Sequence, residues 1–431
     1  MEGHSDTADR ARVPRTSQRA VNRATVVACL ALFTDLLVYG IAIPVLPLLP
    51  SVVSAGPSAT GALFAGYAAA TLVITPVAGR LVDRFGPSRP LLVALVVLAA
   101  ASALFTVGDT YPVLLLARVV QGAAAGLGWV SGLALIAVTT APSARGKAMG
   151  LALSMVSVGV LVGPPLAGLL VQRLTVHAPF EFAAALALVV ALIALIAAPR
   201  AGGTGGLPGG TRAVLRSPGV VPVLAVVVIA AGTLASVEPV LPLRLTLGFG
   251  MDALTVGLLF AAVVLASATV TPLAGGLVGR MDSRLLCAVG AAAAAAGLIM
   301  LGIASSLWQV WVGAVLLGVG EGVLLASSTA LMGLLVGETT LGAGYALYNL
   351  AYAGGLMIGP LAAGSGTGSI GFRSTLVTLG AVTVLVAVLT LPRLPAARSA
   401  VSGADTSAED GAGTAADGTA AEGGTDSAYG P

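Results

Sequence analysis

Long stretches of this sequence contain no ionisable side chain, and this feature most constrains what the chain can fold into. Residues 90–107 and 183–198 are two such stretches. Each approaches the ~20 residues that a helix needs to cross the ~30 Å hydrocarbon core of a bilayer. Because backbone groups in lipid must be hydrogen-bonded within their own segment, these stretches predict membrane-spanning helices.

The composition excludes a soluble protein. The 431 residues are 57% hydrophobic and 9% charged, whereas a soluble domain is about 25% charged. The first apolar stretch, 24–49, follows an Arg-rich tail but lacks the short hydrophobic region and the A-x-A cleavage site of a signal peptide. We therefore expect it to remain in the protein as the first span.

Apolar windows separated by short polar breaks predict twelve transmembrane helices. The windows are 24–49, 58–79, 90–107, 111–140, 147–172, 180–198, 220–245, 254–279, 285–303, 307–336, 342–365 and 373–392. The expected fold class is an all-α membrane protein.

A polar linker separates two predicted six-helix halves, 24–198 and 218–392, and a polar tail flanks each end. Residues 1–23 form an Arg-rich tail, residues 199–217 a Gly-rich linker, and residues 393–431 an acidic tail without periodicity. Gly-rich linkers are flexible, and tails of this composition are disordered. We expect the linker to join the two halves on the cytoplasmic side.

Basic residues fall almost entirely on one side of the predicted helices. With the N-terminus inside, the outer loops hold only Arg173, Arg244 and Arg373 among the basic residues outside the spans. Cytoplasmic loops retain positive charge, so we predict a multi-pass plasma membrane protein with both termini inside. Lys147 is the single lysine, and the abundance of Ala, Gly and Val indicates a high-GC bacterium.

The two predicted halves repeat each other in sequence. An offset of 196 residues aligns Thr75, Gly122, Gly163 and Gly168 with Thr271, Gly318, Gly359 and Gly364. An offset of 195 superimposes PVLPL at 44–48 on PVLPL at 239–243. Two parallel six-helix repeats with a substrate bound between them near the midplane are typical of a secondary transporter that works by alternating access.

Residues 79–89, GRLVDRFGPSR, resemble the loop signature between helices two and three of the major facilitator superfamily. The chain is similar to that family over about 24–392. The residues in register are Gly79, Asp83, Arg84 and Gly86, with Arg89 as the following basic residue. We expect them to form a gating loop in which the Asp83 carboxylate has a partner in one conformation and loses it in the other.

Residues 159–168, GVLVGPPLAG, resemble the helix-five signature of the superfamily's antiporters. The matching residues are Gly159, Gly163, Pro164 and Gly168. Small residues four positions apart allow close helix contact, and proline removes a backbone donor and bends the helix. The resemblance implies antiport.

Four ionisable residues lie inside the predicted spans: Asp35, Arg118, Glu238 and Glu321, in helices one, four, seven and ten. Ionisable groups within the membrane are expensive and mark an ion or substrate path by default. These helices hold corresponding places in the two halves, which predicts a shared central cavity. The alternative is a structural ion pair between the arginine and one carboxylate.

Two further resemblances give these charges a role. ARVVQG at 117–122 resembles the helix-four signature RxxQG, which implies that Arg118 and Gln121 help to couple proton movement. TDLLVYGIAIPVLP and SVEPVLPL resemble segments of vesicular monoamine transporters and related drug:proton antiporters. That resemblance implies that Asp35 and Glu238 contact a cationic amine or protons.

Aromatic side chains can bind organic cations through their faces. In helix eleven, Tyr348, Asn349 and Tyr352 are the preferred candidates, because residues four positions apart share one helix face. The other aromatic candidates for the cavity wall are Tyr39, Phe64, Tyr67, Trp129, Phe260 and Tyr345.

We predict a proton-coupled exporter (antiporter) of small lipophilic or cationic compounds, similar to multidrug efflux proteins. The alternatives are an importer or facilitator of a small metabolite and a non-transporting membrane sensor. No P-loop, HExxH, GxSxG or Cys/His cluster occurs in the sequence, so we expect no enzyme, no cofactor and no metal site. The expected partners of a monomer are a small molecule, protons and the lipid bilayer, and no nucleic acid.

Overall fold

The computed structural model describes residues 18–199, 211–278, 280–336 and 340–394. Within them, twelve helices are long and apolar enough to cross a membrane, which confirms the predicted all-α fold with twelve spans. Most of the predicted N-terminal tail, the middle of the linker and nearly all of the acidic tail lie outside the described residues.

The helices fall into the two expected groups of six spans. The first group comprises α1 (Gln18–Val45), η1 (Leu46–Leu48), α2 (Pro50–Ala55), α3 (Pro57–Phe85), α4 (Ser88–Val107), α5 (Tyr111–Thr139), α6 (Pro142–Arg173) and α7 (Ala178–Ala197). Within the predicted linker lies α8 (Thr211–Arg216). The second group comprises α9 (Val220–Val237), α10 (Leu241–Phe249), α11 (Ala253–Leu277), α12 (Ser283–Ile303), α13 (Leu307–Leu335), α14 (Leu341–Ile370), α15 (Phe372–Thr390) and η3 (Leu391–Arg393).

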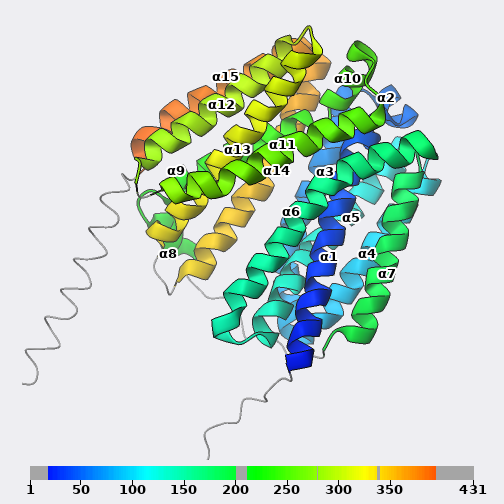
Figure 1. Ribbon diagram of the computed structural model, residues 1–431, viewed down its shortest axis with the longest axis vertical. Coiled ribbons are helices and arrows are strands. Elements are labelled where there is room, and N and C mark those ends of the chain that lie inside the picture. Colours follow the sequence, from blue (N-terminus) through cyan, green and yellow to red (C-terminus); the bar gives the residue numbers. More distant parts are fainter. Residues whose placement is uncertain (1–17, 200–210, 279, 337–339, 395–431) are drawn as a thin grey trace, which may run out of the picture.

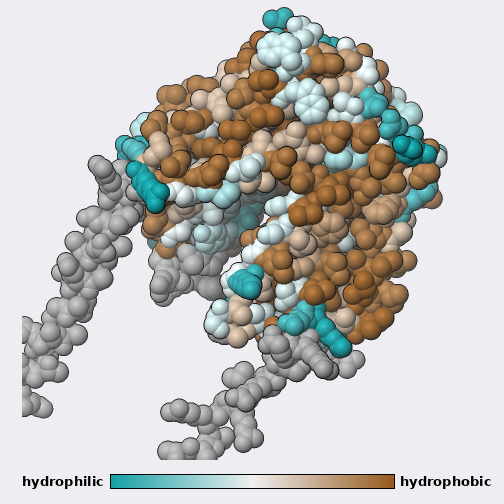
Figure 2. All heavy atoms as spheres, in the orientation of Figure 1, coloured by the Kyte–Doolittle hydropathy of each residue, from teal (hydrophilic) through white to brown (hydrophobic). Residues whose placement is uncertain are grey.

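The two halves meet at one end of the molecule and spread apart at the other (Figure 1). The end at which they meet, which we call the closed end, carries α2 and α10. The open end is where α1 begins and α15 ends. Figure 2 shows a hollow between the halves with less hydrophobic residues on its walls, whereas the outer face is mostly hydrophobic. This distribution is that of a protein surrounded by lipid with a polar cleft.

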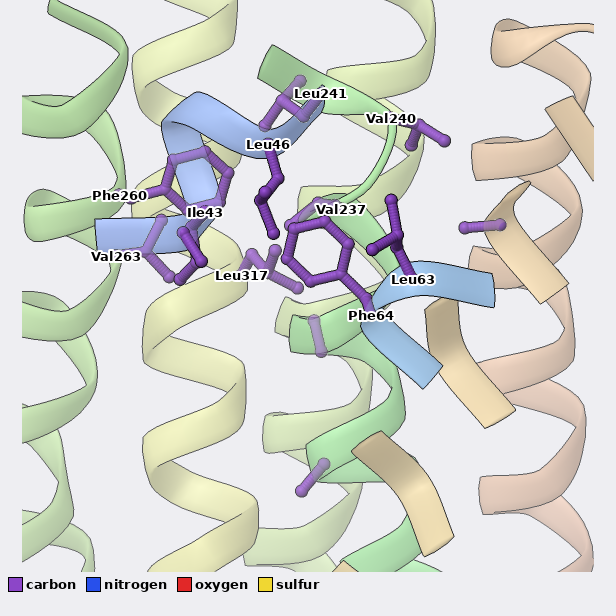
Figure 3. Packing of buried hydrophobic residues seen from close by; sticks show 14 of the residues in the cluster. Ile43, Leu46, Leu63, Phe64, Val237, Val240, Leu241, Phe260, Val263 and Leu317 are labelled. Carbon is purple, nitrogen blue, oxygen red and sulfur yellow. The ribbon is translucent and has the colours of Figure 1, made fainter. Parts of the chain in front are cut away.

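The first and seventh spans are interrupted at the closed end, where the sequence predicted continuous helices. The first breaks after Val45 and the seventh after Val237, and a new helix begins at Leu241. Both breaks coincide with the repeated PVLPL segment, whose prolines lack a backbone donor and clash with the preceding turn. Side chains from the two breaks pack together in a buried cluster that includes Leu46 and Val240 (Figure 3).

The predicted gating loop is wrong in its extent. Gly79, Asp83 and Arg84 lie in the last turns of α3, because that helix continues beyond its apolar part. Gly86 ends the helix with a φ of 74°, a conformation that glycine adopts without strain. Arg89 already belongs to the first turn of α4. The connection between the two helices is therefore a tight turn.

Within each half, glycines bring helix backbones into direct contact. A Cβ atom added at Gly122 of α5 would overlap the carbonyl oxygen of Tyr67 in α3. At the equivalent position of the second half, a Cβ atom on Gly318 of α13 would overlap the carbonyl oxygen of Val263 in α11. The repeat seen in the sequence is thus a repeat of close helix contacts.

The same principle joins the two halves at the closed end. A Cβ atom on Gly61 of α3 would overlap the carbonyl oxygen of Pro360 in α14. Its counterpart, Gly257 of α11, has the same relation to the carbonyl oxygen of Pro164 in α6. We call these two equivalent contacts, α3 with α14 and α11 with α6, the inter-half contacts.

Replacing the glycine of one inter-half contact should open the closed end. We expect Gly257→Leu to lengthen the distance between spin labels on Val107→Cys and Ile303→Cys, measured by pulsed electron resonance in a variant without native cysteines. Both label sites are exposed, at 77% and 46%, and end equivalent helices of the two halves. Gly276→Leu is the matched control, because a Cβ atom there meets nothing within 4 Å. An unchanged distance in Gly257→Leu would contradict this assignment.

Candidate functional site

A cavity of about 120 Å³ lies between the two halves. Its wall is mostly Leu, Ile, Val and Pro, with aromatic side chains from four helices: Tyr39 (α1), Tyr67 (α3), Phe260 (α11) and Tyr352 (α14). Among the described residues that line it, Glu238 carries the one ionisable carboxyl or basic group. The cavity therefore combines an apolar, aromatic wall with a single acidic group.

Glu238 is held at the break of the seventh span. It follows the last residue of α9, and Pro239 after it cannot continue the helical hydrogen bonds. Its side chain is 4% exposed. The hydroxyl of Tyr39, from the other half, donates to the two carboxylate oxygens of Glu238, at 2.7 Å for Oε2 and 2.9 Å for Oε1. The carboxylate thus has a partner across the interface between the halves.

Arg118 is fully buried in α5 and is surrounded by aromatic rings. Its Cζ atom lies 4.7 Å from the ring centroid of Tyr67, 5.0 Å from that of Phe64 and 5.3 Å from that of Tyr39. Its Nη1 donates to Oε1 of Gln121 at 2.5 Å, while Nε and Nη2 have no hydrogen-bond partner among the described residues. The structure therefore stabilises this charge by cation–π contacts and one amide rather than by a hydrogen-bonded carboxylate.

Asp35 does not line the central cavity. It borders a second cavity of about 10 Å³, formed by side chains of α1, α4 and α5 within the N-terminal half. Its side chain is 7% exposed, and its Oδ1 atom has no hydrogen-bond partner in the part of the chain that the structure describes. A space of this size holds about one water molecule. The two carboxylates of helices one and seven therefore face different cavities.

The remaining candidates divide between the cavity and its surroundings. Glu321 is buried in α13 beside the hydroxyl of Ser267, outside the residues that line the central cavity. Tyr352 lines the cavity, whereas Asn349 is exposed. Tyr348 is buried, and its hydroxyl hydrogen-bonds to Ser328 and Thr329 at 3.1 and 2.9 Å. Of the three candidates in helix eleven, the structure places one at the cavity.

The helix-five signature serves two different contacts. A Cβ atom on Gly159 or Gly163 would approach within 2.6 Å of a backbone carbonyl oxygen of α1. Gly168 instead packs against Ala253 and Leu254, the first residues of α11. One turn away in the same inter-half contact, the carbonyl oxygen of Pro164 lies against Gly257 of α11. The signature therefore fixes α6 to its own half and to the opposite half.

A second hydrogen bond between the halves lies at their rim. Asp252, the N-cap of α11, accepts from the backbone N–H of Thr255 at 2.7 Å, and Nε2 of Gln172 donates to its other oxygen at 3.1 Å. The hydrogen bonds from Thr255 lower the pKa of the Asp252 carboxyl group. This exposed pair supplements the buried contact between Tyr39 and Glu238.

The sequence reasoning identified most of the polar residues but missed the apolar wall and the partner of Glu238. Tyr39 was a candidate for the cavity without an assigned contact. Tyr39 lies four residues after Asp35, and this spacing is the signal in the sequence that it shares a helix face with a charged residue. Its contact with Glu238 could not be predicted in this way, because the two residues are 199 positions apart and meet only through the packing of the two halves.

Comparison with known proteins identifies relatives of the whole membrane region. A family model described as Major Facilitator Superfamily matches residues 28–243 and 223–417. The chain is 28% identical to the chromaffin granule amine transporter of Rattus norvegicus over 340 residues, 76% of this chain and 64% of that protein. It is 27% identical to the synaptic vesicular amine transporter of Homo sapiens over 335 residues, 76% of this chain and 65% of that protein. The chain thus spans less than two thirds of the length of these relatives.

Solved structures share the fold. A bacterial homologue of the human lysosomal transporter Spinster, in an inward-facing and unoccupied conformation, matches with a TM-score of 0.73 at 14% identity, covering 88% of this chain and 96% of that chain. The human organic anion transporter MFSD10 matches with a TM-score of 0.61 at 19% identity, covering 86% of this chain and 99% of that chain. At these identities the likeness shows the fold alone.

The aromatic surroundings of Arg118 should not accept a lysine. Lysine is a compact, strongly hydrated cation that cannot stack its charge as a planar guanidinium does. We expect Arg118→Lys to lose about 1–2 kcal/mol of stability and to lower the melting temperature in detergent by a few degrees. Arg373→Lys, at an exposed site, should leave it unchanged. Equal melting temperatures for Arg118→Lys and wild type would contradict the stacking role.

Proposed function

The chain belongs to the major facilitator superfamily, and we propose that it is a proton-coupled secondary exporter of small lipophilic cations or basic compounds. Its fold and relatives are those of transporters, which are not enzymes. Two of these relatives are named as amine transporters. We place the protein in the plasma membrane of a bacterium, working as a monomer.

The observation that carries the proposal is the buried carboxylate of Glu238 in an aromatic, apolar cavity. A lipophilic cation gains from burying its apolar part against such a wall and from a charge contact with the carboxylate. Tyr39, Tyr67 and Tyr352 offer ring faces to a positive charge. The same cavity is a poor site for an anion, because its one charged wall residue is acidic.

The described conformation is the state that is open to the cytoplasm in our proposal. In the first half, the helix ends at the open end carry Arg80 and Arg84 in α3, Arg89 in α4, and Arg145 and Lys147 in α6. Positive charge is retained on the cytoplasmic side of membrane proteins. A compound would then enter the central cavity from the cytoplasm or the inner leaflet and leave when the closed end opens.

Asp35 is our candidate for the proton site that is separate from the substrate. Its water-sized cavity lies inside the N-terminal half, and its carboxyl group shares that half with the buried charge of Arg118. A carboxylate near a fixed positive charge is stabilised in its ionised form, and burial favours the neutral form. Movements that change the distance from Asp35 to Arg118, or the burial of Asp35, would make this carboxyl group take up or release a proton during the cycle.

Proton-driven export can be tested in inverted membrane vesicles that hold a respiration-driven pH gradient. Tetraphenylphosphonium, arylalkylamines and neutral antibiotics are added while a fluorescent dye reports the gradient. We expect the cations to dissipate the gradient, and Glu238→Gln to reduce this response about tenfold or more, the loss of one charged contact. Glu181→Gln, an exposed site in α7, is the matched control. No response to any cation in wild-type vesicles would refute proton-coupled export of cations.

Asp35→Asn should separate binding from coupling. Because this residue faces the second cavity, we expect the variant to bind tetraphenylphosphonium with an affinity within about threefold of wild type, measured by equilibrium binding. Its proton-driven transport should be abolished, while exchange of labelled for unlabelled cation continues. Loss of binding together with transport would place Asp35 in the substrate site instead.

A further inference from the structure

Two side-chain hydrogen bonds connect the halves within the described part of the chain. One joins Gln172 to Asp252 at the exposed rim. The other joins Tyr39 to Glu238 and is buried, since Glu238 is 4% exposed and Tyr39 packs against the hydrophobic core. The buried bond is therefore the polar contact between the halves that water does not reach freely.

This bond lies at the break of the seventh span. Glu238 occupies the break between α9 and α10, and α10 lies at the closed end. Around the break, Val237, Val240 and Leu241 belong to the same buried cluster as Ile43 and Leu46 of the first span, and Figure 3 shows Leu241 beside Leu46. Separation of the halves at this end would pull the Glu238 carboxylate away from the Tyr39 hydroxyl.

Tyr39 is itself fixed to the N-terminal half by its ring. The ring lies 5.3 Å from the Arg118 guanidinium and 5.0 Å from the ring of Tyr67. Its hydroxyl reaches across to the other half. The side chain therefore connects the buried cation of one half to the buried carboxylate of the other.

The bond between Tyr39 and Glu238 has no polar counterpart in the repeat. The offset of 195 residues that superimposes the two PVLPL segments relates Tyr39 to Leu234 and Glu238 to Ile43. Leu234 and Ile43 both line the same cavity. One side of the interface therefore carries a polar pair that a cation or a proton can disturb. The equivalent positions on the other side carry apolar residues, which neither a cation nor a proton would disturb.

We propose that Tyr39 is the positioning residue through which the state of Glu238 controls the closed end. While Glu238 is ionised and no cation is bound to it, the hydrogen bond from the Tyr39 hydroxyl holds α1 to the break after α9. A cation at the carboxylate competes with the hydroxyl, and a proton converts a charge-assisted hydrogen bond into a weaker neutral one. Either event releases the closed end. This inference rests on the proposed function, in which the cation is the substrate.

Several titratable groups from other elements lie around Glu238 and interact with it electrostatically. They are Tyr39 in α1, Tyr67 in α3, Arg118 in α5, Glu321 in α13 and Tyr352 in α14. Among them, Tyr39 is the one whose hydroxyl is hydrogen-bonded to the carboxylate. A change that removes only this hydroxyl therefore isolates the bond from the remaining electrostatic environment.

Tyr39→Phe tests the proposal through the distance between labels on Val107→Cys and Ile303→Cys in lipid nanodiscs without ligand. We expect the ratio of long to short distances to rise about tenfold or more over wild type. Tyr111→Phe is the control, because it removes a tyrosine hydroxyl whose hydrogen bond, to the carbonyl oxygen of Ala59, stays within the N-terminal half. A wild-type distribution in Tyr39→Phe would overturn the proposal, and so would an equal shift in Tyr111→Phe.

A double-mutant cycle adds a readout that general destabilisation would not produce. Tyr39→Phe and Glu238→Gln disturb the same bond, so the double variant should shift the distance ratio no further than the larger single effect. Additive shifts would show that the two residues act independently and would overturn the proposal.

The response to ligand separates this inference from the proposed function. In wild type, tetraphenylphosphonium should raise the long-distance population, and in Tyr39→Phe it should add less than twofold to a population that is already raised. A Tyr39-dependent distance change in a protein that shows no proton-driven transport would refute the proposed function and retain the control of the closed end. Proton-driven transport with no Tyr39-dependent distance change would retain the proposed function and refute the control of the closed end.

Discussion

The contact of a glycine with a backbone carbonyl on a neighbouring helix is the interaction on which this structure depends. In lipid there is no hydrophobic driving force for helices to associate, so close van der Waals packing holds them together. Gly122 and Gly318 supply such contacts inside the halves, and Gly61 and Gly257 supply them between the halves. Because each contact has a counterpart in the other half, two equivalent helix pairs join the halves at the closed end.

On this symmetric frame the charges are asymmetric. The offset of 196 residues that aligns the glycines relates Arg118 to Ala314 and Glu321 to Ala125, and the offset of 195 that superimposes the PVLPL segments relates Glu238 to the apolar Ile43. The glycines that pack the helices are repeated, whereas each of these buried charged residues occurs in one half alone. The separation also explains how one superfamily fold can carry different substrates: the frame can stay constant while single polar residues in the cavity change.

The sequence predicted the frame better than the site, for physical reasons. Span number and the repeat follow from hydrophobicity and glycine spacing, both of which are local. The end of α3 was misplaced because hydrophobicity stops near Gly79, while the helix continues through polar residues until Gly86 ends it. Asn349 and Tyr352 are three positions apart on α14, yet one is exposed and the other lines the cavity. Such differences depend on the rotation of a helix against its neighbours, which hydrophobicity alone does not define.

The size of the central cavity connects binding to movement. At about 120 Å³ it is smaller than the roughly 300–1,000 Å³ of sites that hold drug-sized ligands. A compound of that size can reach Glu238 only if the walls move apart, and these walls come from both halves. The hydroxyl of Tyr39 already occupies the position at the carboxylate that a cation would take. In the proposed function, entry of a cation at Glu238 therefore breaks a contact between the halves, and part of the binding energy drives their relative movement.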